Sequence, residues 1–317
     1  QDAGASSKSE TKKRANLEYL TTKDKLLDGL TDANLNLKSN DRYNIRVLSP
    51  KYVNIFQTIE KSPGPSLCYS QFRTVEGIEV FTRMLESNGF HPYQLGSQIE
   101  YQIREGSRIR YQVDTDIWTT LEVVQIQNQL YGVSAIQLHN NLSEIYQENG
   151  YSSGEADRKS QIVVGRLTEE SKLIQELPPQ RLTKSQSYRN MPNSSRKSDL
   201  TRRKSTKWGG GDLKSEPIIY LPTTNSKGDQ QIFNATYAIW DSSLGQDLLD
   251  QFNNPDNKYG QHISVIFITM AGAEGISLYN VRQVHVMEPF WNKVKIDQVI
   301  GRARRIDSHA KLPAGNE

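Results

Sequence analysis

The sequence predicts an α/β fold with a mostly parallel sheet flanked by helices, interrupted by a small β-rich insert and a disordered basic tract. The run His262–Met270 is dense in β-branched residues, which indicates a strand buried on both faces of a parallel sheet. A second strand, Val281–Met287, follows closely, and apolar residues at helical spacing before and after the pair predict flanking helices. The chain thus alternates strands and helices at its C-terminal end.

The N-terminal part is expected to carry the first half of the same α/β domain. Residues 1–42 are predicted to be a polar tail that ends in a connection to another lobe. Residues 43–61 have a partly amphipathic helical pattern, and Ser66–Phe72 is strand-like. A second helix should follow and end at Gly89, because glycine accepts the left-handed backbone that closes many helices. Residues 43–95 are therefore assigned to the domain.

Residues 96–149 are expected to form an insert. Polar breaks separate three β-rich runs, which is typical of hairpins. The runs are Arg108–Val113, Ile117–Ile126 and Tyr131–Ile136. We favour an inserted small antiparallel sheet or barrel, with a rhythm similar to that of Tudor or SH3-like modules. The alternative is that these runs extend the sheet of the α/β domain.

Residues 150–231 are expected to be a basic low-complexity linker. Its part from 150 to 215 holds 14 Lys and Arg against 7 Asp and Glu. With few aromatic residues it cannot bury enough apolar surface to offset its chain entropy, so it should stay flexible. Its basic clusters can either lie along a phosphate backbone or belong to a solvated linker without a partner. Residues 232–317 then complete the α/β domain.

A loop of small residues directly follows the buried strand at His262–Met270. It contains Ala271, Gly272, Ala273, Glu274, Gly275, Ile276 and Ser277. Small residues let backbone N–H groups approach a ligand closely, and open α/β sheets bind ligands at the carboxyl ends of their strands. The loop is therefore a candidate ligand site.

The stretch Gln298–Arg305 is expected to be one α-helix with a polar face. At about 100° per residue, Gln298, Arg302 and Arg305 fall within roughly 60° of one another. The opposite side carries Ile296, Val299, Ile300, Ala303 and Ile306. Two arginines one turn apart can offer forked donors to a polyphosphate, and Gly301 removes bulk where another surface must come close. Taken alone, such a helix is more typical of an amphipathic surface helix whose arginines are solvated.

The loop, the second strand and the arginine stretch together resemble motifs V and VI of superfamily 2 helicases and translocases, where motif VI reads Gln-x-x-Gly-Arg-x-x-Arg. The Pro-x-Trp-Asn element at 289–292 is similar to the Swi/Snf-like branch. The sequences of residues 252–260 and 271–277 resemble those of helicases of nucleocytoplasmic large DNA viruses, of the poxvirus early transcription factor and nucleoside triphosphate phosphohydrolase type. Ser66–Phe72 resembles motif IV. The resemblance implies a C-terminal RecA-like lobe.

The resemblance also implies roles for individual residues. Arg305 would be the arginine finger on the γ-phosphate of ATP, Arg302 would stabilise transition-state charge beside it, and Gln298 would orient both. The nucleotide side of the site would include Gly272, Glu274, Gly275 and Gly301. The nucleic-acid backbone, of DNA in preference to RNA, would be met by Ser70, Gln71, Ala271 and Ser277.

The sequence contains no Gly-x-x-x-x-Gly-Lys-Ser/Thr loop and no Asp-Glu pair at the end of an apolar strand. In the resembling family an N-terminal RecA-like lobe supplies these parts and holds most of the contacts to ATP and Mg²⁺. We therefore expect that lobe as a partner within the same polypeptide, since the chain starts with Gln1 rather than Met, and we expect the chain alone to be inactive. The rival interpretation is a non-catalytic transcription-factor subunit or nucleic-acid-binding scaffold, against which the intact arginine pair argues.

Composition excludes several classes of protein. Cys68 is the only cysteine, so a disulfide within the chain is impossible and a cysteine-based zinc site is excluded. The five histidines lack ligand spacing, and no metal site is expected in the chain. Without a membrane-length apolar run or a signal peptide, we expect an intracellular protein, in the host cytoplasm or virion if it is viral, or in the nucleus. RNA polymerase or a transcription-factor subunit is a candidate further partner.

Overall fold

The computed structural model of the chain describes most of its residues, in two compact units. The described residues are 21–22, 25, 27–73, 77–96, 101–114, 116–127, 130–176, 217–224, 228–240, 245–269, 275–288, 292–310 and 312. Unit 1 takes its described residues from 1–59, 64–99 and 236–312, and unit 2 takes them from 60–63 and 100–235. Each unit is thus assembled from separate stretches of chain.

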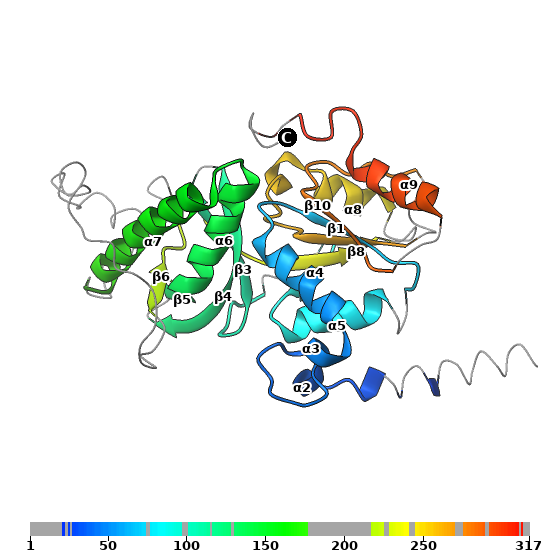
Figure 1. Ribbon diagram of the computed structural model, residues 1–317, viewed down its shortest axis with the longest axis horizontal. Coiled ribbons are helices and arrows are strands. Elements are labelled where there is room, and N and C mark those ends of the chain that lie inside the picture. Colours follow the sequence, from blue (N-terminus) through cyan, green and yellow to red (C-terminus); the bar gives the residue numbers. More distant parts are fainter. Residues whose placement is uncertain are drawn as a thin grey trace, which may run out of the picture. The chain divides into compact units, whose positions relative to one another are not determined.

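Unit 1 is built on a sheet of five parallel strands in the order β10-β1-β9-β8-β2 (Figure 1). The strands are β1 (Ser66–Tyr69), β2 (His91–Pro92), β8 (Thr236–Ile239), β9 (Val265–Ile268) and β10 (Gln283–Val286). In the middle of the sheet, Ser66 lies opposite Val265 on one side and Gln283 on the other. Strands β1 and β9 are buried along their whole length, as the apolar run of β9 predicted.

Helices cover both faces of this sheet, which confirms the predicted α/β fold class. They are α2 (Asp32–Leu35), α3 (Ile45–Leu48), α4 (Pro50–Lys61), α5 (Ile78–Ser87), α8 (Gly245–Phe252), the short 3-10 helix η3 (Pro255–Asn257) and α9 (Lys293–Ala303). On one face, the ring of Phe81 from α5 lies 5.8 Å from that of Phe267 on β9. On the other face, α8 and α9 share a buried cluster with Leu67 and Ile266. Ile266 and Phe267 are adjacent on β9 and therefore pack against the helices on opposite faces of the sheet.

Proline and glycine set the limits of the first helices. The predicted helix at residues 43–61 is broken into α3 and α4, and Pro50, which lacks an N–H donor, opens α4. The predicted end of α5 is confirmed: Gly89 has φ of 88°, its N–H donates to the Glu86 carbonyl at 3.0 Å, and the Phe90 N–H donates to the Leu85 carbonyl at 3.0 Å. These two bonds form a Schellman motif, which satisfies carbonyls at the helix end.

Unit 2 contains an antiparallel sheet in the order β6-β5-β4-β3-β7 and two helices (Figure 1). Its elements are β3 (Arg108–Asp114), β4 (Ile117–Gln127), β5 (Leu130–Ser134), α6 (Ala135–Glu148), α7 (Ser153–Glu176), β6 (Ile218–Leu221) and β7 (Ile232–Asn234). The three predicted β-rich runs are strands of a separate antiparallel sheet. Among the described residues this sheet is open rather than closed into a barrel, with β6 and β7 at its edges.

The predicted boundaries of the insert and the linker were wrong. Helix α7 lies inside the range 150–231 and packs its apolar side into the core of unit 2, and β6 pairs with β5. The α7 side chains in that core are Ala156, Val163, Val164 and Leu167. The charged residues between them hid this helical stripe in the composition of the tract. Residues 177–216, which hold the densest basic clusters, lie outside the described residues.

The segment before α3 is packed against α5. Asn36 donates from its side-chain amide to the Ser87 carbonyl at 2.7 Å, and the Leu37 N–H donates to the Asn88 side-chain oxygen at 2.9 Å. Part of the predicted polar tail and connection, residues 1–42, therefore belongs to the folded unit. Residues 1–20 lie outside the described part of the chain.

Unit 1 should lose stability as the pH falls from about 6.5 to about 4. Burial lowers the pKa of His285 on β10 from its ordinary value of 6.5 to about 4, and burial also lowers the pKa of His262. In that pH range the unfolded chain binds a proton at His285 that the folded chain does not, which favours unfolding as the pH drops. Urea unfolding should show a shallower pH dependence for His285→Asn, in which His262 still contributes. Equal slopes for the two proteins would rule out this role of His285.

Candidate functional site

The carboxyl ends of β1 and β10 meet at one edge of the sheet in unit 1. Ser70 and Gln71 follow β1, and Glu288 follows β10. The Glu288 carboxylate joins the two strand ends: one oxygen accepts from the Ser70 hydroxyl at 2.7 Å and the other accepts from the Gln71 N–H at 3.0 Å. Ser70 is 0% exposed. Its side chain, predicted to meet nucleic acid, is thus engaged within the protein.

The negative charge of Glu288 contributes to raising the pKa of two neighbouring tyrosines. Burial, with the charge of Glu288 as the second cause, raises the pKa of Tyr52 to about 12. The same two causes raise the pKa of Tyr69. Both tyrosines therefore remain neutral hydrogen-bonding groups at physiological pH. In the described part of this edge, the Glu288 carboxylate accepts its hydrogen bonds from neutral groups, the Ser70 hydroxyl and the Gln71 N–H.

The small-residue loop after β9 is only partly described. Ala271, Gly272 and Glu274 lie outside the described residues. Gly275, where the description resumes, has φ of 83°, a left-handed backbone that favours glycine, and it is exposed. A Cβ added there would meet no atom within 4 Å. The backbone conformation of Gly275, rather than a close contact, therefore favours glycine at this position.

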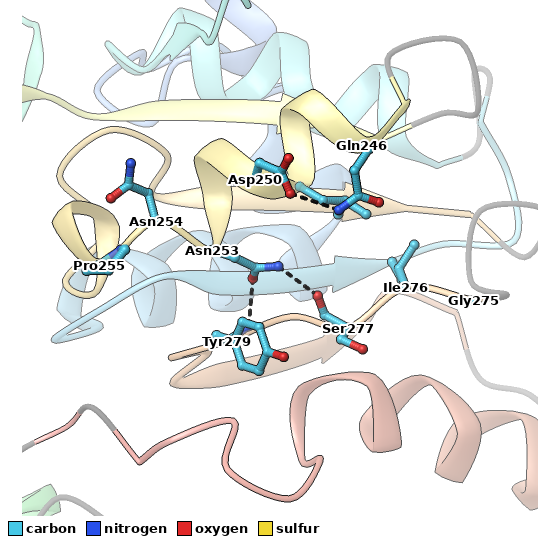
Figure 2. Close-up of a pocket in the computed structure, with 10 residues that line it drawn as sticks. Gln246, Asp250, Asn253, Asn254, Pro255, Gly275, Ile276, Ser277 and Tyr279 are labelled. Carbon is cyan, nitrogen blue, oxygen red and sulfur yellow. Dashed lines mark hydrogen bonds between the residues drawn. The ribbon is translucent and has the colours of Figure 1, made fainter.

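The segment that follows Gly275 is held between α8 and the arginine stretch. Asn253, just after α8, donates to the Ser277 carbonyl at 2.9 Å and accepts from the Tyr279 N–H at 2.8 Å (Figure 2). From the other side, Arg305 donates a hydrogen bond to the Ser277 hydroxyl. One asparagine and one arginine thereby fix the path of this backbone.

The predicted helix Gln298–Arg305 was wrong in its last turn. Helix α9 ends at Ala303, so Arg305 lies beyond it and shares no helical face with Gln298 and Arg302. Ile306, expected to pack, is 91% exposed. The opposite side of the helix does pack as predicted through Val299 and Ala303.

Tertiary hydrogen bonds explain why the helix stops. The Ser308 hydroxyl donates to the Ala303 carbonyl at 3.1 Å, and the Ser308 carbonyl accepts from the Asn280 N–H at 2.8 Å. The His309 ring lies 2.8 Å from the Val281 carbonyl. These contacts draw the chain away from the helix axis and back to the segment before β10, and Asp307 adopts φ of 64° in that turn.

The structure brings together some predicted site residues and separates others. Arg302 lies in the last turn of α9, and its carbonyl accepts from the Leu278 N–H at 3.1 Å, so both arginines adjoin the segment 275–279. Gln298 and Gly301 are exposed on α9, and a Cβ added at Gly301 would meet no atom within 4 Å. Ser70 and Gln71 instead contact Glu288.

A cavity of about 510 Å³ lies between α8 and the segment 275–279 (Figure 2). Its lining is Gln246, Leu249, Asp250, Asn253, Asn254, Pro255, Gly275, Ile276, Ser277 and Tyr279. On its α8 side, Gln246 donates to the Asp250 carboxylate at 2.8 Å. Sequence reasoning missed Asn253 and Glu288; the asparagine pair after a predicted helix was the available signal for the first.

The described residues hold no group of three or more His, Cys, Asp or Glu side chains arranged to bind a metal ion. None of the helices in the described part is both long enough and apolar enough to cross a bilayer.

Residues 218–307 match the family described as the helicase conserved C-terminal domain. This part of the chain is therefore similar to helicase C-terminal domains. The match begins at β6 and β7 of unit 2 and continues through the whole stretch from β8 to α9. It therefore covers the small-residue loop and the arginine stretch, and the predicted identity of the C-terminal lobe is confirmed.

Three relatives that match part of the chain are viral proteins. A termination factor NPH-I homolog of African swine fever virus is 44% identical over 72 residues, which are 22% of this chain and 10% of that relative. The nucleoside triphosphatase I of Melanoplus sanguinipes entomopoxvirus is 38% identical over 105 residues, 30% of this chain and 16% of the relative. A proposed ATP-dependent RNA helicase of Acanthamoeba polyphaga mimivirus is 47% identical over 64 residues, 20% of this chain and 8% of the relative.

The chain thus aligns with 8 to 16% of the length of these three viral relatives. No solved structure matches it. The resemblance to superfamily 2 helicases of large DNA viruses, stated above on its motifs, is confirmed by these relatives.

Asn253→Ala should destabilise unit 1 by roughly 1–3 kcal/mol, because it removes the partners of a carbonyl and an N–H at once. The amides of residues 277–279 should also exchange with solvent faster. Gln246→Ala is the matched control, since Gln246 lines the same cavity and its side chain donates to Asp250 on the same helix, and it should change stability by less than about 0.5 kcal/mol. Urea unfolding and hydrogen exchange measure both effects; equal stabilities of the two variants would contradict the assigned role of Asn253.

Proposed function

We propose that the chain supplies the C-terminal lobe of an ATP-dependent nucleic-acid helicase or translocase. In this proposal Arg302 and Arg305 face an ATP molecule bound between this lobe and an N-terminal RecA-like lobe of the same polypeptide. The observation that carries it is the attachment of both arginines to the segment after the small-residue loop, by the Arg302 carbonyl to Leu278 and by the Arg305 side chain to Ser277. The match to the helicase C-terminal domain supports it.

Phosphoryl transfer needs positive charge where negative charge develops on the transferred group. Arg305 is exposed, and its guanidinium donates to the neutral Ser277 hydroxyl, so it keeps several donors for a phosphate. Because that hydroxyl is uncharged, replacing this contact with a phosphate does not break an ion pair. Arg302, three residues earlier in the last turn of α9 and half-buried, would add charge from a fixed helix end, and Gln298 would help to orient the pair.

The nucleotide side of the proposed site also includes four small or acidic positions. Gly275 and Gly301 are exposed and leave open space at their Cα atoms, which suits the approach of another surface. Gly272 and Glu274 of the loop are assigned to the same side. ATP and Mg²⁺ would be held mainly by the N-terminal lobe, which would carry the P-loop and the acidic residues that this sequence lacks.

Nucleic acid is proposed to meet the carboxyl edge of the sheet near Gln71 and the loop at Ala271 and Ser277, with DNA favoured over RNA. Because Ser70 is buried under Glu288, its contribution would come through the position of Gln71 rather than direct contact. Strand ends and loop N–H groups are common phosphate donors. Such binding would weaken with rising salt.

We further propose a role in viral transcription, which the similarity to a viral termination factor homolog and a viral nucleoside triphosphatase I supports. RNA polymerase or a transcription-factor subunit would then be a partner, and the host cytoplasm or the virion the site of action. The rival function, a non-catalytic scaffold lobe, predicts nucleic-acid or protein binding without ATP turnover. The next experiment separates the two.

Arg305→Ala should abolish nucleic-acid-stimulated ATP hydrolysis by the chain joined to a matching first RecA-like lobe. We expect kcat to fall by roughly 10³–10⁵, the usual effect of an arginine finger, with nucleotide affinity nearly unchanged. Arg304→Ala is the control, since Arg304 is exposed and caps α9 through its backbone. Unchanged turnover in Arg305→Ala would reject the finger, and a joined protein that binds DNA but never hydrolyses ATP would favour the scaffold.

Gly301→Ala should separate a structural glycine from one that faces another surface. In the isolated chain, alanine at this open helical position should keep or raise stability, by up to about 1 kcal/mol. In the joined protein, ATP hydrolysis should fall because the added methyl group meets the nucleotide or the first lobe. Thermal unfolding and turnover, measured together, test this; full activity with raised stability would show that no surface approaches Gly301.

A further inference from the structure

Glu288 lies where the end of β10 meets the end of β1, a position that neither the motifs nor the relatives assign. We propose that Glu288 is a positioning residue that couples the β1 corner, Ser70–Phe72, to the arginine helix α9. Nucleic acid at the corner would change the placement of the arginines through this carboxylate. The inference rests on the proposed function, because it concerns how the two proposed contact regions communicate.

The β1 corner is held by hydrogen bonds within unit 1. The Ser70 hydroxyl accepts from the Phe72 N–H at 3.0 Å, and the Phe72 carbonyl accepts from the Ile78 N–H at 3.1 Å at the start of α5. Gly77 makes this packing possible, since a Cβ there would lie 2.1 Å from the Phe72 oxygen and 2.4 Å from the Ser70 Oγ. These contacts link the position of Ser70 to that of Phe72 and the start of α5.

Both oxygens of the Glu288 carboxylate accept hydrogen bonds from the β1 corner. It accepts at 2.7 Å from the Ser70 hydroxyl and at 3.0 Å from the Gln71 N–H, one side-chain and one backbone donor from adjacent residues. Hydrogen bonds to an ionised group are stronger than neutral ones, and two on one carboxylate also fix its orientation. The strand behind it is held too, because Lys51 donates to the Met287 carbonyl. The contact is therefore a directed link rather than a loose surface pair.

Glu288 is close in sequence to the start of the arginine helix. Asn292, four residues later, is the N-cap of α9, and its side chain accepts from the Val294 N–H at 3.0 Å. At the far end of the same helix, the Arg302 carbonyl holds Leu278. A displacement of Glu288 would therefore shift the N-terminus of α9. Through α9 it would shift the segment 275–279, which contacts both arginines.

Hydrogen exchange of the full chain, with and without a mixed-sequence duplex DNA of about 20 base pairs, tests the coupling. In the wild type, DNA should slow exchange in residues 69–72 and also in residues 293–305, the latter by roughly fivefold or more. In Glu288→Gln, which keeps the size of the side chain but loses its charge and one acceptor, the effect at 69–72 should persist and that at 293–305 should disappear. Glu86→Gln, a carboxylate that contacts Tyr237 elsewhere in unit 1, should behave like the wild type.

Ser70→Ala removes the same link from the other side and provides a second variant if Glu288→Gln fails to fold. It should leave DNA bound and reduce the effect at 293–305. Wild-type exchange that slows at 69–72 but not at 293–305 would overturn the coupling and leave the proposed function intact. DNA that alters exchange at neither place would overturn both, and tighter DNA binding by Glu288→Gln would show that Glu288 competes with phosphate instead of transmitting its binding.

Discussion

The register of β1 between β9 and β10 is the constraint on which the rest of unit 1 depends. Ser66 pairs with Val265 and Gln283 at once, so a strand from the first half of the chain is locked between two strands from the second half. A slip of one residue would turn Leu67 and Tyr69 from the α8 and α9 layer toward the opposite one. The same register brings Ser70 and Glu288 to a common edge, where residues more than two hundred positions apart form the β1 corner contact.

Short polar side chains, rather than apolar packing, determine the irregular backbone around the candidate site. Asn253 holds the segment 275–279, and Ser308 ends α9 by binding the Ala303 carbonyl. Glu288 holds the β1 corner. Each of them satisfies backbone groups that regular structure leaves unpaired, which would otherwise cost free energy when buried. The Arg302 backbone and the Arg305 side chain are thereby tied to the segment 275–279 by hydrogen bonds to neutral groups.

Periodicity predicted the regular part of the fold from sequence. The buried run that became β9, the helix closed at Gly89 and the separate β-rich sheet all follow from local patterns of apolar and breaker residues. The end of α9 could not be predicted from such local patterns. Ser308 and Asn280 are distant in the sequence, and the backbone hydrogen bond between them is tertiary. Helix α7 was missed because charged residues between its buried positions resemble a solvated tract. The site residues came from the family resemblance, whereas Glu288 became visible only through geometry.

An arginine finger at this position requires Arg305 to leave Ser277 for the phosphate of a nucleotide held by a first lobe. A structure of the chain joined to a matching first RecA-like lobe, with ADP, Mg²⁺ and an aluminium fluoride mimic of the transferred phosphate, tests this requirement. We expect an Arg305 guanidinium nitrogen within about 3 Å of the mimic and no longer bound to the Ser277 hydroxyl. An Arg305 that still donates to Ser277, with the mimic bound and the lobes closed, would contradict it.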